Sequence, residues 1–115
     1  MQRFDFELIG SWIPERARVL DLGCGDGVLL AGLAATHGVF GYGIEIDDAH
    51  VLASVKNGVN VLQDDLETGL STFGDNTFDF VILSQTLQAM HNVEGVMREM
   101  LRVGREGIVT FPNFG

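Results

Sequence analysis

The feature that most constrains this chain is the segment Val-Leu-Asp-Leu-Gly-Cys-Gly-Asp-Gly at residues 19–27. A short apolar run with one acid leads into three glycines that alternate with small or polar residues, and apolar residues at helical spacing follow directly. This order predicts a strand, a tight turn and the start of a helix, which is the first crossover of an α/β nucleotide-binding sheet. We therefore expect the ligand of this chain to lie against the loop.

The spacing of apolar residues predicts helices that alternate with strands. Helices are expected at residues 4–13, 26–37, 48–56 and 93–103, and strands at 18–22, 39–46, 59–63, 77–84 and 107–111. Residues 64–76 are expected to form a loop with one weak helical turn. The helix at 48–56 is expected to bury Val51, Leu52 and Val55, and Asn92 to cap the last helix. The alternation predicts a Rossmann-like parallel α/β sheet of about five strands with helices on both faces.

Composition excludes several classes of protein. A chain of 115 residues with 46% hydrophobic and 20% charged residues is typical of one globular domain, here expected to span residues 1–115. It contains no apolar run near the ~20 residues of a membrane span, and its N-terminus lacks the layout of a signal peptide. The single cysteine excludes an internal disulfide and favours a reducing compartment, so a cytoplasmic protein without a membrane partner is expected. The three histidines lack metal-site spacing, and no metal is expected.

The formal charge of −9 narrows the choice of ligand further. It would repel a phosphate backbone, so nucleic acid is not an expected partner. Several acids fall at or just after the ends of predicted strands, where open α/β sheets bind ligands: Asp21, Asp26, Glu45, Asp47, Asp48, Asp64 and Asp65. A pocket with this rim favours a cationic or hydroxyl-rich small molecule over a triphosphate.

Two phosphate-binding interpretations of the glycine loop are weakened by its sequence. A Walker-type loop requires Lys and then Ser or Thr after its last glycine, whereas Gly27 is followed by Val28 and Leu29. A dinucleotide loop requires a third small residue where this chain has Val28. Asp26 also places a negative charge where the helix N-terminus would receive a pyrophosphate. A dinucleotide-dependent reductase is therefore kept only as the weaker alternative.

The segment at 19–27 resembles the first motif of class I S-adenosylmethionine-dependent methyltransferases. S-adenosylmethionine carries a sulfonium and an ammonium but no phosphate, so an acid-rich loop attracts it. The resemblance implies that Glu45 accepts from the ribose hydroxyls and Asp65 from the adenine amino group. It also implies that Ile46 and Leu66 flank the adenine ring. The expected cofactor-binding residues are Asp21, Gly23, Cys24, Gly25, Gly27, Glu45, Ile46, Asp64, Asp65, Leu66, Ser84 and Gln85.

The roles of some of these residues are left open by the sequence. Asp21 either holds the loop backbone or contacts the ligand, and of Asp64 and Asp65 only one needs to reach the adenine. Cys24 is interpreted as a small residue selected for fit. Methyl transfer depends mainly on alignment, with a base where the acceptor must lose a proton. His91 is the best available base, with a surface histidine as the simpler interpretation, and no catalytic residue is assigned.

Four further segments resemble the MetW family of methionine biosynthesis. They are Gly41–Asp47, Ser84–Ala89, Arg98–Arg105 and Phe111–Gly115, and the similarity extends from Phe4 to the last residue. The resemblance implies a small-molecule methyltransferase of methionine biosynthesis without an established acceptor. It also implies an association with homoserine O-acyltransferase. The alternative function is therefore a non-catalytic accessory or regulatory subunit of that acyltransferase.

The chain departs from the family at its C-terminal end. Members of the family continue beyond residues 111–115, and a class I sheet normally has two further strands after the fifth. We therefore expect a C-terminally truncated chain whose fifth strand offers an exposed edge for homo-oligomer formation. Arg98, Arg102 and Arg105 form a basic stripe at helical spacing. This stripe is either a docking face for the acyltransferase or an ordinary solvated helix face.

Overall fold

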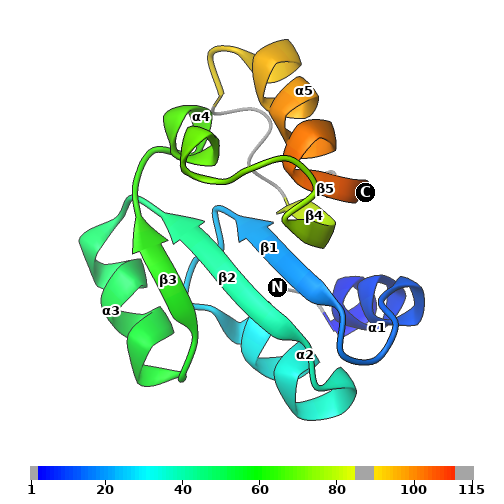
Figure 1. Cartoon of the computed structure of the whole chain (residues 1–115). Helices are drawn as coiled ribbons and strands as arrows, with labels where there is room; N and C mark the ends of the chain where they lie inside the picture. The colour runs from blue at the N-terminus through cyan, green and yellow to red at the C-terminus, as the bar shows by residue number, and fades with distance from the viewer. Residues whose placement is uncertain (1–2, 85–89, 111–115) are drawn as a thin grey trace.

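The computed structural model describes residues 3–84 and 90–110, and it has the predicted α/β architecture (Figure 1). Five parallel strands form one sheet in the order β3-β2-β1-β4-β5. The strands are β1 (Arg18–Leu22), β2 (Phe40–Glu45), β3 (Asn60–Gln63), β4 (Phe78–Ser84) and β5 (Gly104–Thr110). The helices are α1 (Arg3–Trp12), α2 (Val28–His37), α3 (Asp48–Lys56), α4 (Leu66–Gly69), the short 3-10 helix η1 (Leu70–Thr72) and α5 (Val93–Val103). The prediction of the fold class is confirmed.

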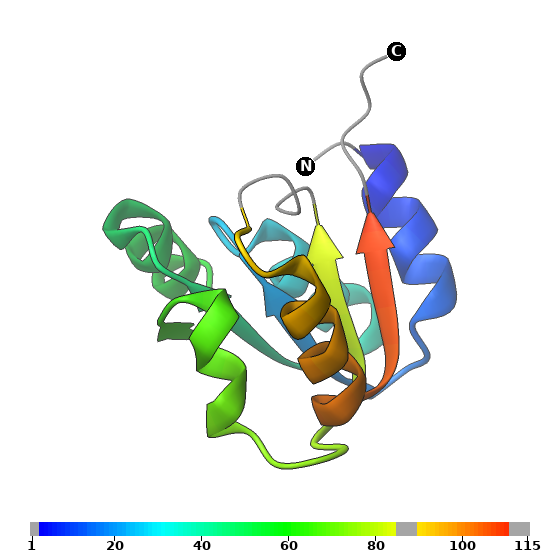
Figure 2. The same ribbon diagram turned by 90° about the horizontal axis from the view of Figure 1, so that it is seen from above.

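The order of the strands creates a switch point beside β1. The first strand, β1, lies in the centre of the sheet. The chain then continues outward through β2 to β3 and returns to β4 on the other side of β1. All carboxyl ends of the strands point to one edge, as the arrowheads of β4 and β5 show in Figure 2. In open α/β sheets ligands bind at this edge, next to the strands where the direction of winding reverses. The loop after β1 lies at that position.

Two apolar cores cover the two faces of the sheet. Because side chains alternate along a strand, Val19 and Leu20 of β1 point to opposite faces. Val19 packs in a cluster with Ile9 of α1 and Leu33 of α2. Leu20 packs in the second cluster with Met100 of α5. The central strands are thus buried on both faces, which is typical of parallel sheets and agrees with their nearly continuous apolar sequence.

The N-cap of α5 is the predicted residue, whereas the buried face of α3 differs from the prediction. Asn92 caps α5, accepting a hydrogen bond from the amide of Gly95 at 3.0 Å. The prediction that α3 buries Leu52 and Val55 is wrong, since their exposed fractions are 56% and 57%. Ser54 is the residue that α3 buries completely. Helix α3 contacts β3, the edge strand, and therefore has little sheet surface to cover.

Two segments contain more regular structure than the sequence indicates. Residues 64–76 hold both α4 and η1, where one weak helical turn is predicted. Strand β5 begins at Gly104, three residues before the predicted start at 107, because Gly104 pairs with Phe78 of β4. Within the described residues, β5 is the last strand and forms one edge of the sheet. No helix in the same part of the chain is long and apolar enough to cross a membrane.

We expect the two glycines of β2 to respond differently to replacement by alanine. A Cβ atom at the buried Gly43 would collide with the Sγ and Cβ atoms of Cys24, which belong to the loop after β1. A Cβ atom at Gly41 would meet only the end of the flexible Leu30 side chain, at 3.0 Å. Gly43→Ala should therefore lower the free energy of unfolding in urea by ~1–3 kcal/mol, and Gly41→Ala by clearly less. Equal losses would contradict close packing of the loop against β2.

Candidate functional site

The loop between β1 and α2 has a backbone that only glycine adopts easily. Gly23, Gly25 and Gly27 have φ angles of 69°, 59° and 80°, all in the left-handed region. The amides of Gly23 and Cys24 donate to the carbonyl oxygen of Ile44, at 2.8 Å and 3.1 Å. These bonds place the loop over the carboxyl end of β2. The three glycines that identified the loop in the sequence are therefore required by its conformation.

Helix α3 fixes the far side of this loop through two side chains that the sequence analysis missed. The buried hydroxyl of Ser54 donates to the carbonyl oxygen of Gly25 at 2.7 Å. The side-chain amide of Asn57 donates to the carbonyl oxygen of Asp26 at 2.8 Å. The only signal in the sequence is a polar residue between Val51, Leu52 and Val55, and that signal is not specific. The loop is thus held between β2 and α3.

Glu45, the last residue of β2, joins the loop to the pocket. Its Oε1 atom accepts from the amide of Gly25 at 2.8 Å. Its Oε2 atom accepts from the amides of Ile46 and Asp47, at 3.1 Å and 3.0 Å. The carboxylate is thereby oriented by three backbone donors. A ligand hydroxyl that approaches it meets an acceptor that is already in place.

Beside Glu45 lies a cavity of about 310 Å³, a size at the lower end of small-molecule sites. It brings together six of the predicted residues, namely Gly23, Glu45, Ile46, Asp64, Asp65 and Leu66. The remaining lining residues are Ile44, Glu67, Met90 and His91. The side chains of Ile46 and Leu66 supply apolar surface, and four of the lining residues are carboxylates. This combination suits a ligand with a flat apolar part, hydroxyl groups and positive charge.

The two neighbouring acids after β3 are each tied to local backbone. Asp65 caps α4, accepting from the amide of Glu67 at 2.8 Å. The Oδ1 atom of Asp64 accepts from the amide of Asp65, also at 2.8 Å. Both residues line the cavity, so their position alone does not select which of them would contact a ligand.

Asp21 lies outside the set of cavity-lining residues and is almost completely buried, with an exposed fraction of 3%. Its Oδ1 atom has no hydrogen-bond partner among the described residues. Burial, and to a smaller extent the charge of Glu45, raises the pKa of this carboxyl to about 8. The ligand-free chain therefore holds a proton on Asp21 at neutral pH.

The remaining residues singled out in the sequence are Cys24, Ser84, Gln85 and His91. Cys24 is buried, and its Sγ atom lies 3.7 Å from the hydroxyl of Ser54. Burial raises the pKa of the thiol to about 11, which keeps it protonated and unreactive. Ser84 ends β4, while Gln85 lies outside the described residues. His91 lies at the rim of the cavity, and 95% of its side chain is exposed.

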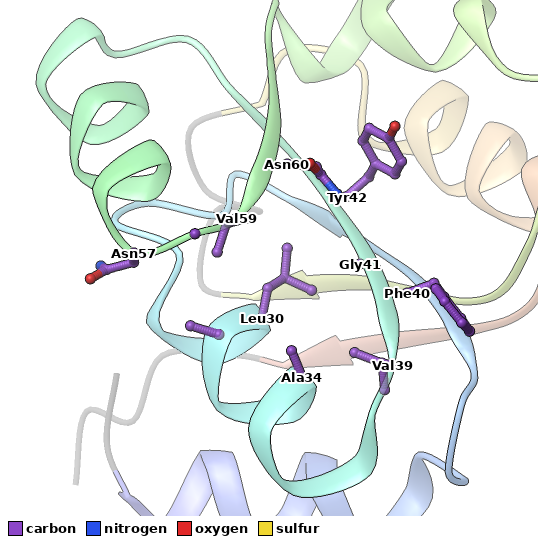
Figure 3. Close-up of a pocket in the computed structure, with 11 residues that line it drawn as sticks. Leu30, Ala34, Val39, Phe40, Gly41, Tyr42, Asn57, Val59 and Asn60 are labelled. Atoms are coloured by element: carbon purple, nitrogen blue, oxygen red, sulfur yellow. The ribbon is translucent and has the colours of Figure 1, made fainter.

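A second cavity, of about 330 Å³, lies against the amino-terminal half of β2 (Figure 3). The side chains of Leu30, Ala34, Val39 and Val59 point toward one another there. Its lining contains no carboxylate, histidine or lysine, and Tyr42 is its one titratable residue. In the described part of the chain, no group of three or more His, Cys, Asp or Glu side chains could hold a metal ion.

The fold is that of solved S-adenosylmethionine-dependent methyltransferases. A possible histamine N-methyltransferase from Thermotoga maritima is 23% identical, with a TM-score of 0.73, over 87% of this chain and 44% of its own. A possible methyltransferase from an antibiotic biosynthesis pathway of Anabaena variabilis is 22% identical, with a TM-score of 0.77, over 89% of this chain and 41% of its own. The [4+2]-cyclase SpnF is 24% identical, with a TM-score of 0.77, over 88% and 40%. At these identities the likeness concerns the fold alone.

The chain belongs to the MetW family. The family described as methionine biosynthesis protein MetW matches residues 3–115. The bifunctional methionine biosynthesis protein MetXA/MetW of Rhodopirellula baltica is 45% identical over 118 residues, which cover 96% of this chain. The match covers only 19% of that relative, so the chain spans about a fifth of its length.

The raised pKa of Asp21 predicts a pH-dependent stability. The unfolded chain releases this proton near the ordinary value of 3.8, whereas the folded chain holds it up to about pH 8. The free energy of unfolding should therefore fall as the pH rises between these values, by up to ~1.4 kcal/mol per pH unit. Asp21→Asn removes the titrating group, so urea unfolding at about pH 5 and pH 8 should show a smaller loss than in the wild type. The control is Asn in place of the exposed Asp26, and an unchanged pH dependence in Asp21→Asn would contradict the assignment.

Proposed function

We propose that this MetW-family chain binds S-adenosylmethionine in the cavity beside Glu45 and acts as a small-molecule methyltransferase of methionine biosynthesis. The observation that supports this proposal is that residues from three separate strand ends line one cavity: Gly23 after β1, Glu45 and Ile46 at the end of β2, and Asp64, Asp65 and Leu66 after β3. The cavity lies at the carboxyl edge of the sheet, where this fold binds ligands.

Each part of the proposed ligand has a matching group in the cavity. We propose that Glu45, whose carboxylate is oriented by backbone amides, accepts from the ribose hydroxyls, and that Asp65, which lines the same cavity, accepts from the adenine amino group. Ile46 is 63% exposed and, with Leu66, offers apolar surface that an adenine ring would cover. When bound, the cofactor supplies an electrophilic methyl group, and its positive charges are attracted by the acidic lining.

The N-terminus of α2 argues against a dinucleotide as the ligand of this site. A pyrophosphate would bind the free amides at the N-terminus of this helix. Here the carboxylate of Asp26 accepts from the amide of Val28 at 3.1 Å and adds a negative charge. A dinucleotide would have to displace this side chain and overcome its repulsion.

A second candidate role is association with homoserine O-acyltransferase, as an accessory subunit. The observation that favours it is the fusion of MetXA with MetW in the Rhodopirellula relative. The prediction of a basic stripe on one helix is wrong, because α5 ends at Val103 and Arg105 lies in β5. The two arginines on α5 also make a poor docking face, because Arg98 pairs with Glu94 and Arg102 bonds Glu99, Asp75 and two backbone carbonyl oxygens.

The structure offers an aromatic surface for such a partner instead. Phe40 and Tyr42 of β2 are 66% and 47% exposed, and they line a hollow of about 520 Å³ together with Leu62, Phe73 and Phe78. Exposed aromatic residues beside a hollow are typical of the centres of protein interfaces. This hollow lies against the amino-terminal half of β2, while the proposed cofactor cavity lies at the carboxyl end of the same strand. Both surfaces could therefore be occupied at once.

Calorimetric titration with S-adenosylmethionine, S-adenosylhomocysteine and NAD tests the proposed cofactor. The two sulfur ligands should bind and NAD should not. Glu45→Ala should weaken binding by ~10- to 100-fold, since it removes a charged hydrogen-bond acceptor. Ile46→Ser should weaken it by about tenfold through lost apolar contact. Leu52→Ser, at a similarly exposed residue of α3 outside the cavity, should not change it. Binding of NAD alone would refute the proposal.

Association with purified homoserine O-acyltransferase distinguishes the two candidate docking faces. Phe40→Ser, combined with Tyr42→Ser, should weaken the complex by more than about tenfold if these aromatic side chains lie at its centre. Arg98→Glu, combined with Arg105→Glu, should change the affinity by less than about twofold. Leu101→Ser is the matched control, because this exposed apolar residue lies on α5, outside the hollow. The opposite ranking would assign docking to the basic stripe.

A further inference from the structure

Glu67 of α4 makes a contact that the proposed cofactor chemistry does not use. Its Oε1 atom accepts from the backbone amides of His91 and Asn92, at 3.1 Å and 2.6 Å. The glutamate side chain is mostly buried, with 20% exposed. A single carboxylate oxygen thus joins α4 to two backbone amides that lie 24 and 25 residues further along the sequence.

These bonds fix the start of α5. Asn92 is the N-cap of that helix, and its own side chain is occupied by the amide of Gly95. The amides at a helix N-terminus have no partner within the helix and attract negative charge. Glu67 supplies both an acceptor and a charge from the neighbouring helix. Glu67 is itself held by Asp65, whose carboxylate accepts from the amide of Glu67 at 2.8 Å.

The segment that Glu67 holds forms part of the proposed cofactor cavity. Met90 and His91 line this cavity together with Glu45 and Ile46, which lie at the carboxyl end of β2. We infer that Glu67 is a positioning residue, whose carboxylate holds the start of α5 so that Met90 and His91 complete the wall of the cavity. This inference rests on the proposed function for its relevance to the cofactor, but its structural part is independent of any ligand.

The backbone bonds, rather than the ion pair with the histidine ring, carry this role. The Nδ1 atom of His91 lies 3.7 Å from Oε2 of Glu67, but 95% of the histidine side chain is exposed. Exposed ion pairs contribute little because water and salt screen them. Replacement of the histidine side chain should therefore leave the position of the segment unchanged.

Four variants test the inference: Glu67→Ala, Glu67→Asp, Glu67→Gln and His91→Ala. Because one oxygen accepts both amides, the side-chain carbonyl of glutamine can replace it, whereas alanine has no acceptor and aspartate is too short. Hydrogen exchange of the His91 and Asn92 amides in the ligand-free chain should accelerate by about tenfold or more in the Ala and Asp variants. Affinity for S-adenosylmethionine should fall in parallel by about tenfold in the Ala and Asp variants and by less in the Gln variant. His91→Ala, which removes only the ring, should leave exchange of the Asn92 amide within about twofold of the wild type.

The outcomes separate this inference from the proposed function. If the wild type does not bind S-adenosylmethionine, the proposed function fails, while hydrogen exchange still decides whether Glu67 holds the segment. Unchanged exchange in Glu67→Ala, or a Gln variant that loses as much as the Ala variant, overturns the inference. If Glu67→Ala does not fold, the Asp and Gln variants decide: retention with Gln and loss with Asp supports the role, and the reverse overturns it.

Discussion

The arrangement of the site depends on the carboxylate of Glu45 and the three amides that bond to it. One oxygen holds the glycine loop through Gly25, and the other holds the turn after β2 through Ile46 and Asp47. A charged acceptor with several backbone donors is among the stronger hydrogen-bonding arrangements in proteins. It fixes the loop relative to the strand end, so the cavity between them has a defined shape before any ligand arrives. The same charge contributes to the raised pKa of Asp21 beneath the loop.

Much of this arrangement could be predicted because it follows from local patterns. Apolar runs mark the strands, and in a parallel sheet their carboxyl ends meet at one edge, so Gly23, Glu45 and Asp64 had to lie near one another. Ser54 and Glu67 could not be predicted in the same way. Each is one of several polar residues in its helix, and its role depends on which distant backbone groups the tertiary fold brings to it. The early start of β5 was missed because the pairing with β4, rather than its own polar sequence at 104–106, makes those residues extended.

The side chains of the cavity restrict the possible ligands more than the fold does. Structures of the same architecture include methyltransferases and a cyclase, so the sheet and its helices do not determine a reaction. The four carboxylates around the cavity are more selective, because each of them would repel a ligand that carries phosphate groups. A ligand with hydroxyl groups and positive charge relieves the mutual repulsion of these acids. This electrostatic argument, rather than likeness of fold, favours S-adenosylmethionine over a dinucleotide.

The two proposed roles use opposite ends of one strand. Phe40 begins β2 beside the aromatic hollow, and Glu45 ends it at the cavity. Strand β2 is hydrogen-bonded to β1 and β3 on either side, so it is a rigid element of the sheet. A partner at one end and a ligand at the other would therefore not compete for space. Methyl transfer and association with an acyltransferase are consequently compatible in a single chain, and evidence for one role does not count against the other.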